Sequence, residues 1–393
     1  MTLPRSAVVL VLGTAQTLGW GSTFYLPAIL AEPMAADLGI PVDGVFAAFS
    51  GALLVGVLLG PLAGGRIDSR GGRGLLSLSS LIFAAGLALL GLAQEPAVMV
   101  AAWLIIGVGM TIGLYEAAFS ALASLYGARA RGAITGITLI AGFASTICWP
   151  VSAALEAEVG WRGACFAWAA AHLLIGLPLN RLLPRGVGRP PVPAAGLAPE
   201  PAPPPAERPP IDRTMLLLGF FFATVWFTTA AIGTHLPRLL QQAGASPAAA
   251  IAAAALVGPA QVAGRLLEFG LLQRLHPLFS ARAASLAHPL GAAVLILLGA
   301  PGAVAFSLLH GAGAGVLTIA KGTLPLALFG PHGYGVRQGL LMVPTRLAQA
   351  SAPFLFALLM ARFGTDALAI TAGIGLAGLA ALLLLHPAAA KPT

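Results

Sequence analysis

Charged residues are scarce in this sequence. Asp, Glu, Lys and Arg make up only 9% of the 393 residues, whereas hydrophobic residues make up 58%. Soluble domains carry about 25% charged residues, because their surfaces face water. The composition therefore excludes a water-soluble fold. Since a spanning helix needs about 20 apolar residues, a chain of this length has room for about a dozen spans with short connections.

Thiol groups are also scarce, because Cys148 and Cys165 are the only cysteines and both lie in apolar stretches. Two separated cysteines exclude a disulfide framework, a zinc site of paired cysteines and the clustered thiols that soft-metal or trivalent-arsenic transport requires. We interpret His235, His288 and His310 as hydrogen-bonding partners between helices and not as metal ligands. The sequence predicts no metal and no cofactor.

The sequence also lacks the signatures of pumps, enzymes and nucleic-acid-binding proteins. It contains no phosphate-binding loop of the form G-x-x-x-x-G-K-[ST], which argues against an ATP-driven pump. No nucleophile is paired with a base, so no enzyme activity is expected. The formal net charge is +8, but the basic residues are scattered between apolar segments and form no continuous patch. Nucleic acid is therefore not an expected partner, whereas the lipid bilayer is.

Apolar runs between helix-breaking residues predict twelve membrane spans. Their expected ranges are 6–30, 43–63, 74–94, 97–125, 133–155, 162–183, 214–239, 247–268, 282–299, 302–329, 334–361 and 366–385. The first run is too long for the apolar core of a signal peptide and is predicted to be retained. The sequence thus predicts an all-α membrane protein of twelve transmembrane helices in two pseudo-symmetric six-helix bundles.

A proline-rich segment separates the two predicted bundles. Residues 184–213 combine many prolines with charged residues, which predicts a semi-extended polar linker on the cytoplasmic side. The expected bundles are residues 1–183 and 214–386, and residues 387–393 are expected to form a cytoplasmic tail.

Basic residues mark one side of the predicted membrane protein. The loops on that side carry Arg66, Arg70, Arg73, Arg129, Arg131, Arg181, Arg185, Arg189, Arg208, Arg213, Arg274, Arg282 and Arg337. The opposite loops carry only Arg162, Arg238 and Arg362, together with most of the acidic residues. Because cytoplasmic loops hold the excess of positive charge, the arginine-rich side and both termini are predicted to be cytoplasmic. We expect a monomeric, multi-pass protein of the bacterial inner membrane.

The two halves of the chain share a sequence pattern. Four residues of the first half recur 203 positions later: Gly127, Gly132, Gly136 and Pro150 match Gly330, Gly335, Gly339 and Pro353. The fourth and fifth spans therefore correspond to the tenth and eleventh. Two halves repeated in parallel orientation predict a binding site at their interface, near the middle of the membrane.

The loop that begins at Gly64 reads Gly-Gly-Arg-Ile-Asp-Ser-Arg-Gly-Gly-Arg. It resembles the cytoplasmic signature loop of the major facilitator superfamily, G-x-x-x-D-R-x-G-R. Gly64, Asp68 and Gly71 fit this pattern, whereas Arg70 and Arg73 stand one position later than its arginines. The resemblance implies a secondary transporter that works by alternating access, with this loop as part of the cytoplasmic gate.

The resemblance also implies partners for the loop. In the family, the aspartate meets the N-terminus of the eleventh span, and Arg337 near that N-terminus is expected as a further partner of Asp68. A fainter copy of the loop follows the eighth span, with Gly264, Glu268 and Arg274 at comparable spacing. Glu268 is therefore expected to take part in gating.

Other segments indicate a subgroup of the family. Gly-Trp-Gly at 19–21 and Gly-Trp-Arg at 160–162 resemble bacterial monocarboxylate and cyanate permease relatives. Trp103 stands in the register where many members carry an arginine in the fourth span. The glycine-proline pair of drug antiporters is absent, because Pro150 follows a tryptophan. These departures weaken a drug-exporter interpretation.

Three charged residues fall inside expected spans: Glu116 in the fourth, Lys321 in the tenth and Arg346 in the eleventh. A charge at the bilayer centre costs at least about 2.5 kcal/mol, so each needs a partner or a function. At the helical rise, Glu116 and Lys321 lie at nearly equal depth, about 15 Å from the cytoplasmic ends of their spans. In the family these spans line the cavity, so the two residues are expected to face each other. The alternative is a purely structural network of ion pairs.

The charge balance of the cavity predicts the substrate class. Two or three cations against one carboxylate leave the cavity positive, which favours an anion. Arg346 can bind a carboxylate or phosphate through two parallel hydrogen bonds, and Lys321 adds a point charge. Glu116 is the expected proton carrier. Arg265 in the eighth span is expected to act in gating, unless it is a boundary charge.

Polar and aromatic residues in the expected lining spans would complete the substrate site. The candidates are Gln16, Trp20, Tyr25, Tyr115 and Trp226. The sequence therefore predicts proton-coupled transport of a small organic anion. Because the aromatic candidates also suit an amphipathic ligand, a proton-coupled efflux antiporter for a drug or toxic metalloid stays open. A receptor or scaffold without transport would not need paired charges in the membrane.

Overall fold

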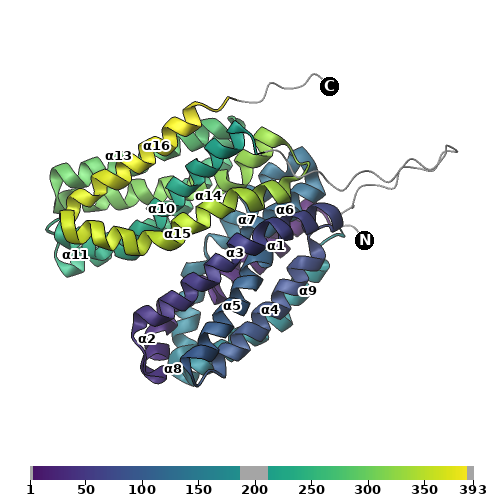
Figure 1. Cartoon of the computed structure of the whole chain (residues 1–393). Helices are drawn as coiled ribbons and strands as arrows, with labels where there is room; N and C mark the ends of the chain where they lie inside the picture. Colours follow the sequence, from purple (N-terminus) through teal and green to yellow (C-terminus); the bar gives the residue numbers. More distant parts are fainter. Residues whose placement is uncertain (1–2, 186–210, 387–393) are drawn as a thin grey trace.

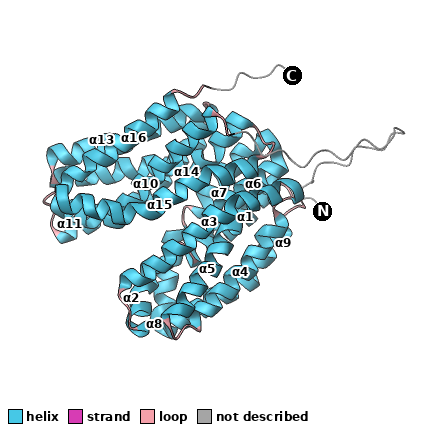
Figure 2. Ribbon diagram, viewed as in Figure 1, coloured by secondary structure: helices cyan, strands magenta, loops and turns pink. Residues whose placement is uncertain are grey.

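The computed structural model describes residues 3–185 and 211–386, and within them the chain forms helices and no strand (Figures 1 and 2). The predicted tail lies outside these ranges, as does most of the predicted linker. Apolar side chains cover much of the outer surface, which is the expected arrangement for helices that face lipid.

The helices gather into two bundles (Figure 1). The first bundle contains α1 (Arg5–Ser22), α2 (Pro27–Leu38), α3 (Val42–Arg70), α4 (Arg73–Gly91), α5 (Pro96–Gly113), α6 (Tyr115–Tyr126), α7 (Arg131–Ala141), α8 (Ala144–Ala171) and α9 (Leu177–Leu182). The second bundle contains α10 (Arg213–Gln242), α11 (Pro247–Ala255), α12 (Val257–Gly270), α13 (Pro277–Leu298), α14 (Ala303–Phe329), α15 (Tyr334–Phe363) and α16 (Ala367–Leu383).

Nine helical stretches of the described chain are long and apolar enough to cross a membrane. Two of them, Pro96–Leu182 with 87 residues and Tyr334–Leu383 with 50, are too long for a single crossing of about 20 residues. Gly127 follows α6 with a φ of 57°, Gly160 interrupts α8 with a φ of 70°, and Gly364 separates α15 from α16 with a φ of 58°. Glycine adopts this left-handed conformation without strain, so the chain can reverse there. With these reversals the described residues hold two six-span halves, as expected.

Several spans differ from their predicted ranges. The first span is longer than predicted and breaks after α1, and the fourth breaks between α5 and α6. The ninth span starts at Pro277 and not at residue 282, so Arg282 lies inside α13. Its guanidinium donates to the carbonyls of Leu382 and Leu385. A charge satisfied by helix-end carbonyls does not have to mark the end of a span.

The two bundles meet most closely where α3 packs on α15. A Cβ atom added to Gly64 would overlap the carbonyl of Gly335, and one added to Gly339 would lie 2.6 Å from the carbonyl oxygen of Gly60. These four glycines let the two backbones touch, which is the usual way for membrane helices to pack tightly. Contact along α3 and α15 holds the two halves together around the central site.

The bundles converge at one end and diverge at the other (Figure 1). They lie together near the start of α7, and they separate toward α2 and α8 in one bundle and α11 in the other. We call the converging end the basic face, because the arginine-rich loops lie there, and we call the other end the opposite face.

Candidate functional site

A cluster of three charged side chains lies between the two bundles. Glu116 accepts a hydrogen bond from Lys321, with 2.5 Å between Oε1 and Nζ, and its Oε2 lies 3.8 Å from Nη2 of Arg346. Glu116 comes from α6 of the first bundle, and its two partners come from α14 and α15 of the second. The prediction that Glu116 and Lys321 face each other is confirmed.

The break in the fourth span positions Glu116. Leu114 has an extended ψ of −165°, which ends α5 and starts α6, so that Glu116 lies in the first turn of α6. The amide of Gln16 donates to the carbonyl of Gly113 at 2.6 Å, which satisfies a backbone group that the break exposes. A carboxylate in the first helical turn is favoured by the positive end of the helix dipole.

Lys321 is only 4% exposed. Its ammonium lies 4.6 Å from the ring centre of Trp226, and the amide of Gln338 donates to its backbone carbonyl. A buried ammonium of this kind is stabilised both by the carboxylate and by the face of the aromatic ring. Trp226 therefore belongs to the cluster by contact.

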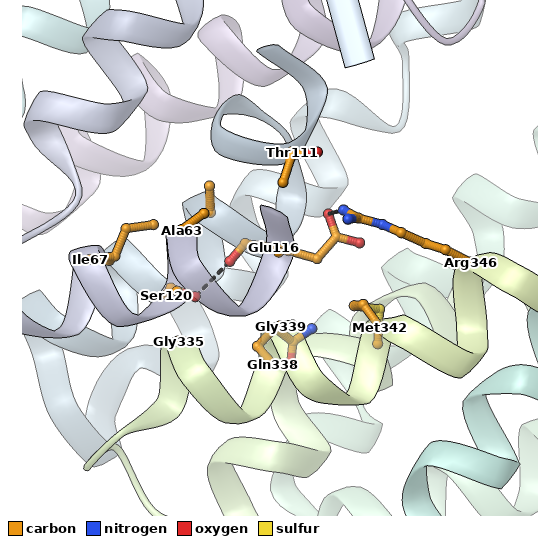
Figure 3. Close-up of a pocket in the computed structure, with 13 residues that line it drawn as sticks. Ala63, Ile67, Thr111, Glu116, Ser120, Gly335, Gln338, Gly339, Met342 and Arg346 are labelled. Carbon is orange, nitrogen blue, oxygen red and sulfur yellow. Dashed lines mark hydrogen bonds and ion pairs between the residues drawn. The ribbon is translucent and has the colours of Figure 1, made fainter. Parts of the chain in front are cut away.

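Arg346 reaches from α15 toward the Glu116 carboxylate (Figure 3). Its guanidinium lies against Gly56 of α3, where a Cβ atom would overlap it. The second terminal nitrogen, Nη1, is buried and has no hydrogen-bond partner in the described part of the chain. The donor capacity of Nη1 is therefore unused in this arrangement.

Two spaces adjoin this cluster, and Glu116 and Arg346 line both of them. The larger, about 40 Å³, is lined by Glu116, Lys321 and Arg346 together with Trp20 and Trp226. The smaller, about 10 Å³, extends from Glu116 toward the basic face between α3 and α15 (Figure 3). The larger one has room for a few water molecules, since one water needs about 10 to 15 Å³.

The other predicted substrate residues lie behind this lining. Tyr115 is buried between Trp20, at a ring distance of 4.8 Å, and Phe119, at 5.2 Å. Tyr25 packs against Trp149, whose indole nitrogen donates to the Tyr25 carbonyl. Gln16 is occupied by the Gly113 carbonyl. Of the predicted substrate residues, Lys321, Arg346, Trp20 and Trp226 line the larger space. Tyr115, Tyr25 and Gln16 do not line it.

Arg265 is a further buried cation, not a boundary charge. It is 5% exposed, and its guanidinium lies against Gly142, where the fifth span is interrupted between α7 and α8. Gly142 is eleven residues from the start of α7, which places the guanidinium deep in the membrane. Within the described residues Arg265 forms no ion pair, and its Nε has no partner. The interface between the halves therefore carries an excess of positive charge.

Asp68 joins the two halves at the basic face, as predicted. Its Oδ1 accepts from the backbone N–H of Gly335 at 2.8 Å, and its Oδ2 accepts from that of Val336 at 3.0 Å. Both donors belong to the first turn of α15, where free N–H groups and the helix dipole favour an anion. Gly71 ends α3 with a φ of 77°, which turns the chain away at once.

Arg337, which was predicted to be a further partner of Asp68, does not contact it. Arg337 donates to the carbonyl of His332 at 2.6 Å and stacks on Phe329, so that prediction was wrong. Arg70 and Arg73 form no hydrogen bond or ion pair within the described residues. Each carboxylate oxygen of Asp68 accepts one backbone N–H from α15, and Arg337 is directed instead to the His332 carbonyl and the Phe329 ring.

A second connection at the basic face joins Arg131 to Glu268. Nη2 of Arg131 lies 3.1 Å from Oε1 of Glu268, and Nη1 donates to the Leu275 carbonyl at 2.6 Å. The sequence argument included Glu268 but counted Arg131 only as a loop charge. The internal repeat contained part of the signal, because Arg131 precedes Gly132, the counterpart of Gly335. Glu268 thus meets the start of α7, although it binds the Arg131 side chain where Asp68 binds backbone N–H groups of α15.

His276 caps α13 beside this connection. Its Nδ1 accepts from the backbone N–H of Leu278 at 3.2 Å. Burial lowers the pKa of His276, and the nearby guanidiniums of Arg131 and Arg282 lower it further. The ring therefore stays neutral at pH 7, which leaves Nδ1 free to accept.

The described residues contain no cluster of three or more His, Cys, Asp or Glu side chains able to hold a metal ion. The chemistry that the central cluster offers is ionic. A carboxylate can gain or lose a proton, and two cations can bind whatever anion replaces it.

Gly56 provides a test of how Arg346 is held. In Gly56→Ala the new methyl group would overlap the guanidinium and move it away from Glu116. Overpacking of this kind costs about 1–3 kcal/mol, so we expect substrate affinity to fall roughly tenfold. Gly51→Ala on the same helix is the control, because its methyl group would meet only Leu104, at 3.7 Å. Equal binding by both variants would show that Arg346 does not depend on this space.

Sequence and structure comparisons give concordant results. The sequence profile of the Major Facilitator Superfamily matches residues 11–303. An uncharacterized 38 kDa protein in the 23S RNA operon of Thermoproteus tenax is 31% identical over 163 residues, which cover 40% of this chain and 42% of that protein. The chain thus matches about two-fifths of that relative's length.

Three solved structures share the fold over nearly their whole length. The human organic anion transporter MFSD10 (TETRAN) has a TM-score of 0.68 and 17% identity, and the match covers 97% of this chain and 100% of that one. The proton:xylose symporter XylE has a TM-score of 0.73 and 15% identity, with 98% of this chain and 96% of that one covered. The E. coli fucose:proton symporter FucP has a TM-score of 0.74 and 14% identity, with 95% of this chain and 97% of that one covered. At these identities the likeness shows the fold alone.

The profile match, the two six-span halves and the apolar surface together identify a multi-pass membrane transporter and not an enzyme. The chain belongs to the Major Facilitator Superfamily.

Proposed function

We propose that this transporter moves a small organic anion by alternating access and couples its movement to protons. The observation that carries the proposal is the central cluster, in which one carboxylate, Glu116, is bound by two cations from the opposite half. The cluster lines a cavity between the halves, where a substrate must bind if both faces are to reach it in turn.

The charge of the cavity favours an anion. Lys321 and Arg346 outnumber Glu116, and Arg265 adds a buried cation without a carboxylate partner in the described chain. An intramembrane cation is costly unless an anion neutralises it, so these groups would bind a negatively charged substrate. The planar fork of the Arg346 guanidinium suits a carboxylate or phosphate, which accepts two parallel hydrogen bonds.

Glu116 is the proposed proton carrier. In the empty site it neutralises Lys321 and partly neutralises Arg346, in the position that a substrate carboxylate would take. When Glu116 binds a proton, both cations lose their partner and can bind the substrate anion. In both the empty ion-paired form and the loaded form with a protonated Glu116, one anionic group lies between Lys321 and Arg346. A protonated site without substrate leaves both cations without a partner, so it should change conformation slowly.

We propose that the basic face is cytoplasmic, because arginine-rich loops remain inside. The contacts of Asp68 and Arg131 then close the cytoplasmic side, and the diverging ends open outward. This orientation suits a bacterial inner-membrane protein with both termini inside. The proteins that share the fold include an organic anion transporter and two proton symporters, which is consistent with the proposed chemistry.

Uptake and counterflow in proteoliposomes would test the proposed function. We would compare small carboxylates, phosphorylated acids and lipophilic cations, with and without an imposed pH gradient. The proposal requires an anion that accumulates when the gradient is imposed and exchanges without it.

Trp20, Trp226 and Phe24 line the cavity and could also contact an amphipathic compound. Activity with a cationic drug and none with anions would therefore favour a proton-coupled efflux antiporter.

Asp68→Asn should favour inward-facing states. Asparagine keeps one acceptor for the α15 amides but loses the charge, and a hydrogen bond to a charged group contributes about 1.5–3 kcal/mol. We expect the ratio of inward- to outward-facing protein to rise about tenfold. Labelling rates of reporter cysteines facing the cytoplasmic end of the cavity would measure the change.

The control for this experiment is Asp43→Asn, which removes an acidic residue from the other end of the same helix. Labelling that is unchanged in Asp68→Asn, or changed equally in both variants, would contradict a closing role for Asp68.

A further inference from the structure

A pair of histidines lies inside the second bundle, apart from the central cluster. Nδ1 of His288 on α13 is 3.1 Å from Nδ1 of His310 on α14, and Nε2 of His288 is 3.0 Å from Oγ1 of Thr371 on α16. Both rings are buried. The expectation that these histidines join helices is thus confirmed.

The hydrogen bonds assign the tautomers of the two rings. The Thr371 hydroxyl donates to the Leu368 carbonyl at 3.0 Å, so its oxygen accepts from His288. His288 therefore carries its proton on Nε2 and accepts at Nδ1. The donor to that nitrogen must be the Nδ1–H of His310. The remaining nitrogen of His310, Nε2, is then an acceptor, and it makes no hydrogen bond within the described chain.

His310 lines a cavity of about 30 Å³ between α10, α13, α14 and α16. The hydroxyl groups of Thr228, Thr229 and Ser285 also line it, and the Thr228 hydroxyl is buried with no partner in the described residues. A cavity of this size with several polar groups suits about two water molecules. The unused nitrogen and hydroxyl are therefore in a place where water can satisfy them.

We propose that the His288–His310 pair is a second protonation site of this transporter, which accepts a proton at His310 Nε2 from water in the cavity. The new N–H bond forms on the free lone pair, and the Nδ1–H of His310 still donates to His288. Transfer of that Nδ1 proton would leave His310 neutral and His288 charged. The pair can thus share one proton without changing a rotamer or breaking the contact with Thr371.

The surroundings determine how firmly a proton is held. None of the cavity-lining residues from α10, α13, α14 or α16 is charged. On α13 the nearest charged residue is Arg282, whose guanidinium is bound to carbonyls, and on α14 it is Lys321, three turns from His310. Because no carboxylate faces the pair, only water and hydroxyl groups stabilise the charge. A proton bound there would be released readily, as a transport cycle needs.

Nitrogen-15 NMR of the histidine rings in the full-length protein would test this site. A scalar coupling across the Nδ1–H···Nδ1 bond should identify the pair among the seven histidines of the chain without any substitution. Between pH 8 and pH 4, we expect the two coupled rings to shift together with the uptake of one proton. Coupled rings that stay neutral over this whole range would overturn the proposal and leave a fixed interhelical hydrogen bond.

Substitutions give a second measurement. His310→Gln should remove the shared transition and lower the proton uptake of the purified protein by one per molecule over the same pH range. The control is His235→Gln, which removes another histidine of a span, one bonded to the Pro353 carbonyl. Equal proton uptake by a folded His310→Gln protein and the wild type would contradict the site. Because neither readout uses transport, a failure here is distinct from a failure of the role proposed for Glu116.

Discussion

Glu116→Gln is expected to abolish proton-driven accumulation of the substrate while exchange across the membrane continues. Glutamine has nearly the shape of the protonated carboxyl group, so the variant imitates the form in which Lys321 and Arg346 are free to bind an anion. It cannot release a proton, so the empty site cannot return to the ion-paired form. The empty return step then carries unpaired cations and becomes slow.

The measurement compares accumulation under an imposed pH gradient with counterflow under none, in the same proteoliposomes. We expect accumulation to fall to the background of empty liposomes and counterflow to stay within a few-fold of the wild type. Glu95→Gln, at the start of the same span and exposed, is the control. Full accumulation by Glu116→Gln would exclude Glu116 as the proton carrier. Loss of both accumulation and counterflow would show that Glu116 is needed for the structure of the site.

Arg346→Ala should remove anion binding itself. The guanidinium lines the cavity, and losing one side of a buried, charged contact costs about 2–5 kcal/mol. We therefore expect affinity to fall by at least about 30-fold. The fold should survive, because Glu116 keeps its 2.5 Å partner Lys321. Direct binding to purified protein, by calorimetry or by protection against thermal unfolding, would measure the effect.

Two further variants make this result specific. Arg362→Ala removes an arginine from the far end of the same helix, where it stacks on Phe363, and should bind as the wild type does. Arg346→Lys keeps the charge but loses the planar guanidinium, so its affinity should lie between those of Arg346→Ala and Arg362→Ala. Unchanged affinity in Arg346→Ala would show that the substrate anion binds elsewhere, with Arg265 as the next buried cation to test.

The layout of this protein could be predicted from its sequence because the relevant signals are local. Apolar runs of spanning length, the internal repeat and the signature loop at Gly64 were sufficient for two six-span halves and for the contact of Asp68 with α15. Glu116, Lys321 and Arg346 were recognisable because a charge inside an apolar run is expensive wherever the helix faces. Their equal depth followed from the helical rise alone.

The partners of individual side chains could not be predicted in the same way. In a membrane, lipid-facing and protein-facing positions are both apolar, so hydropathy does not reveal which face of a helix points inward. The structure alone showed that Gly56 makes room for Arg346 and that Gln16 is used by the Gly113 carbonyl. It also showed that Arg337 contacts the His332 carbonyl and not Asp68.

The sequence by itself therefore determined the number of spans, their pairing into halves and the presence of costly charges between them. The tertiary structure decided which of those charges meet, through helix rotation and through breaks such as the one at Leu114. Rotation and breaks depend on contacts between segments far apart in the chain, as the pairs Arg131–Glu268 and His288–His310 illustrate. Such contacts exist only once the helices pack, so local sequence patterns cannot specify them.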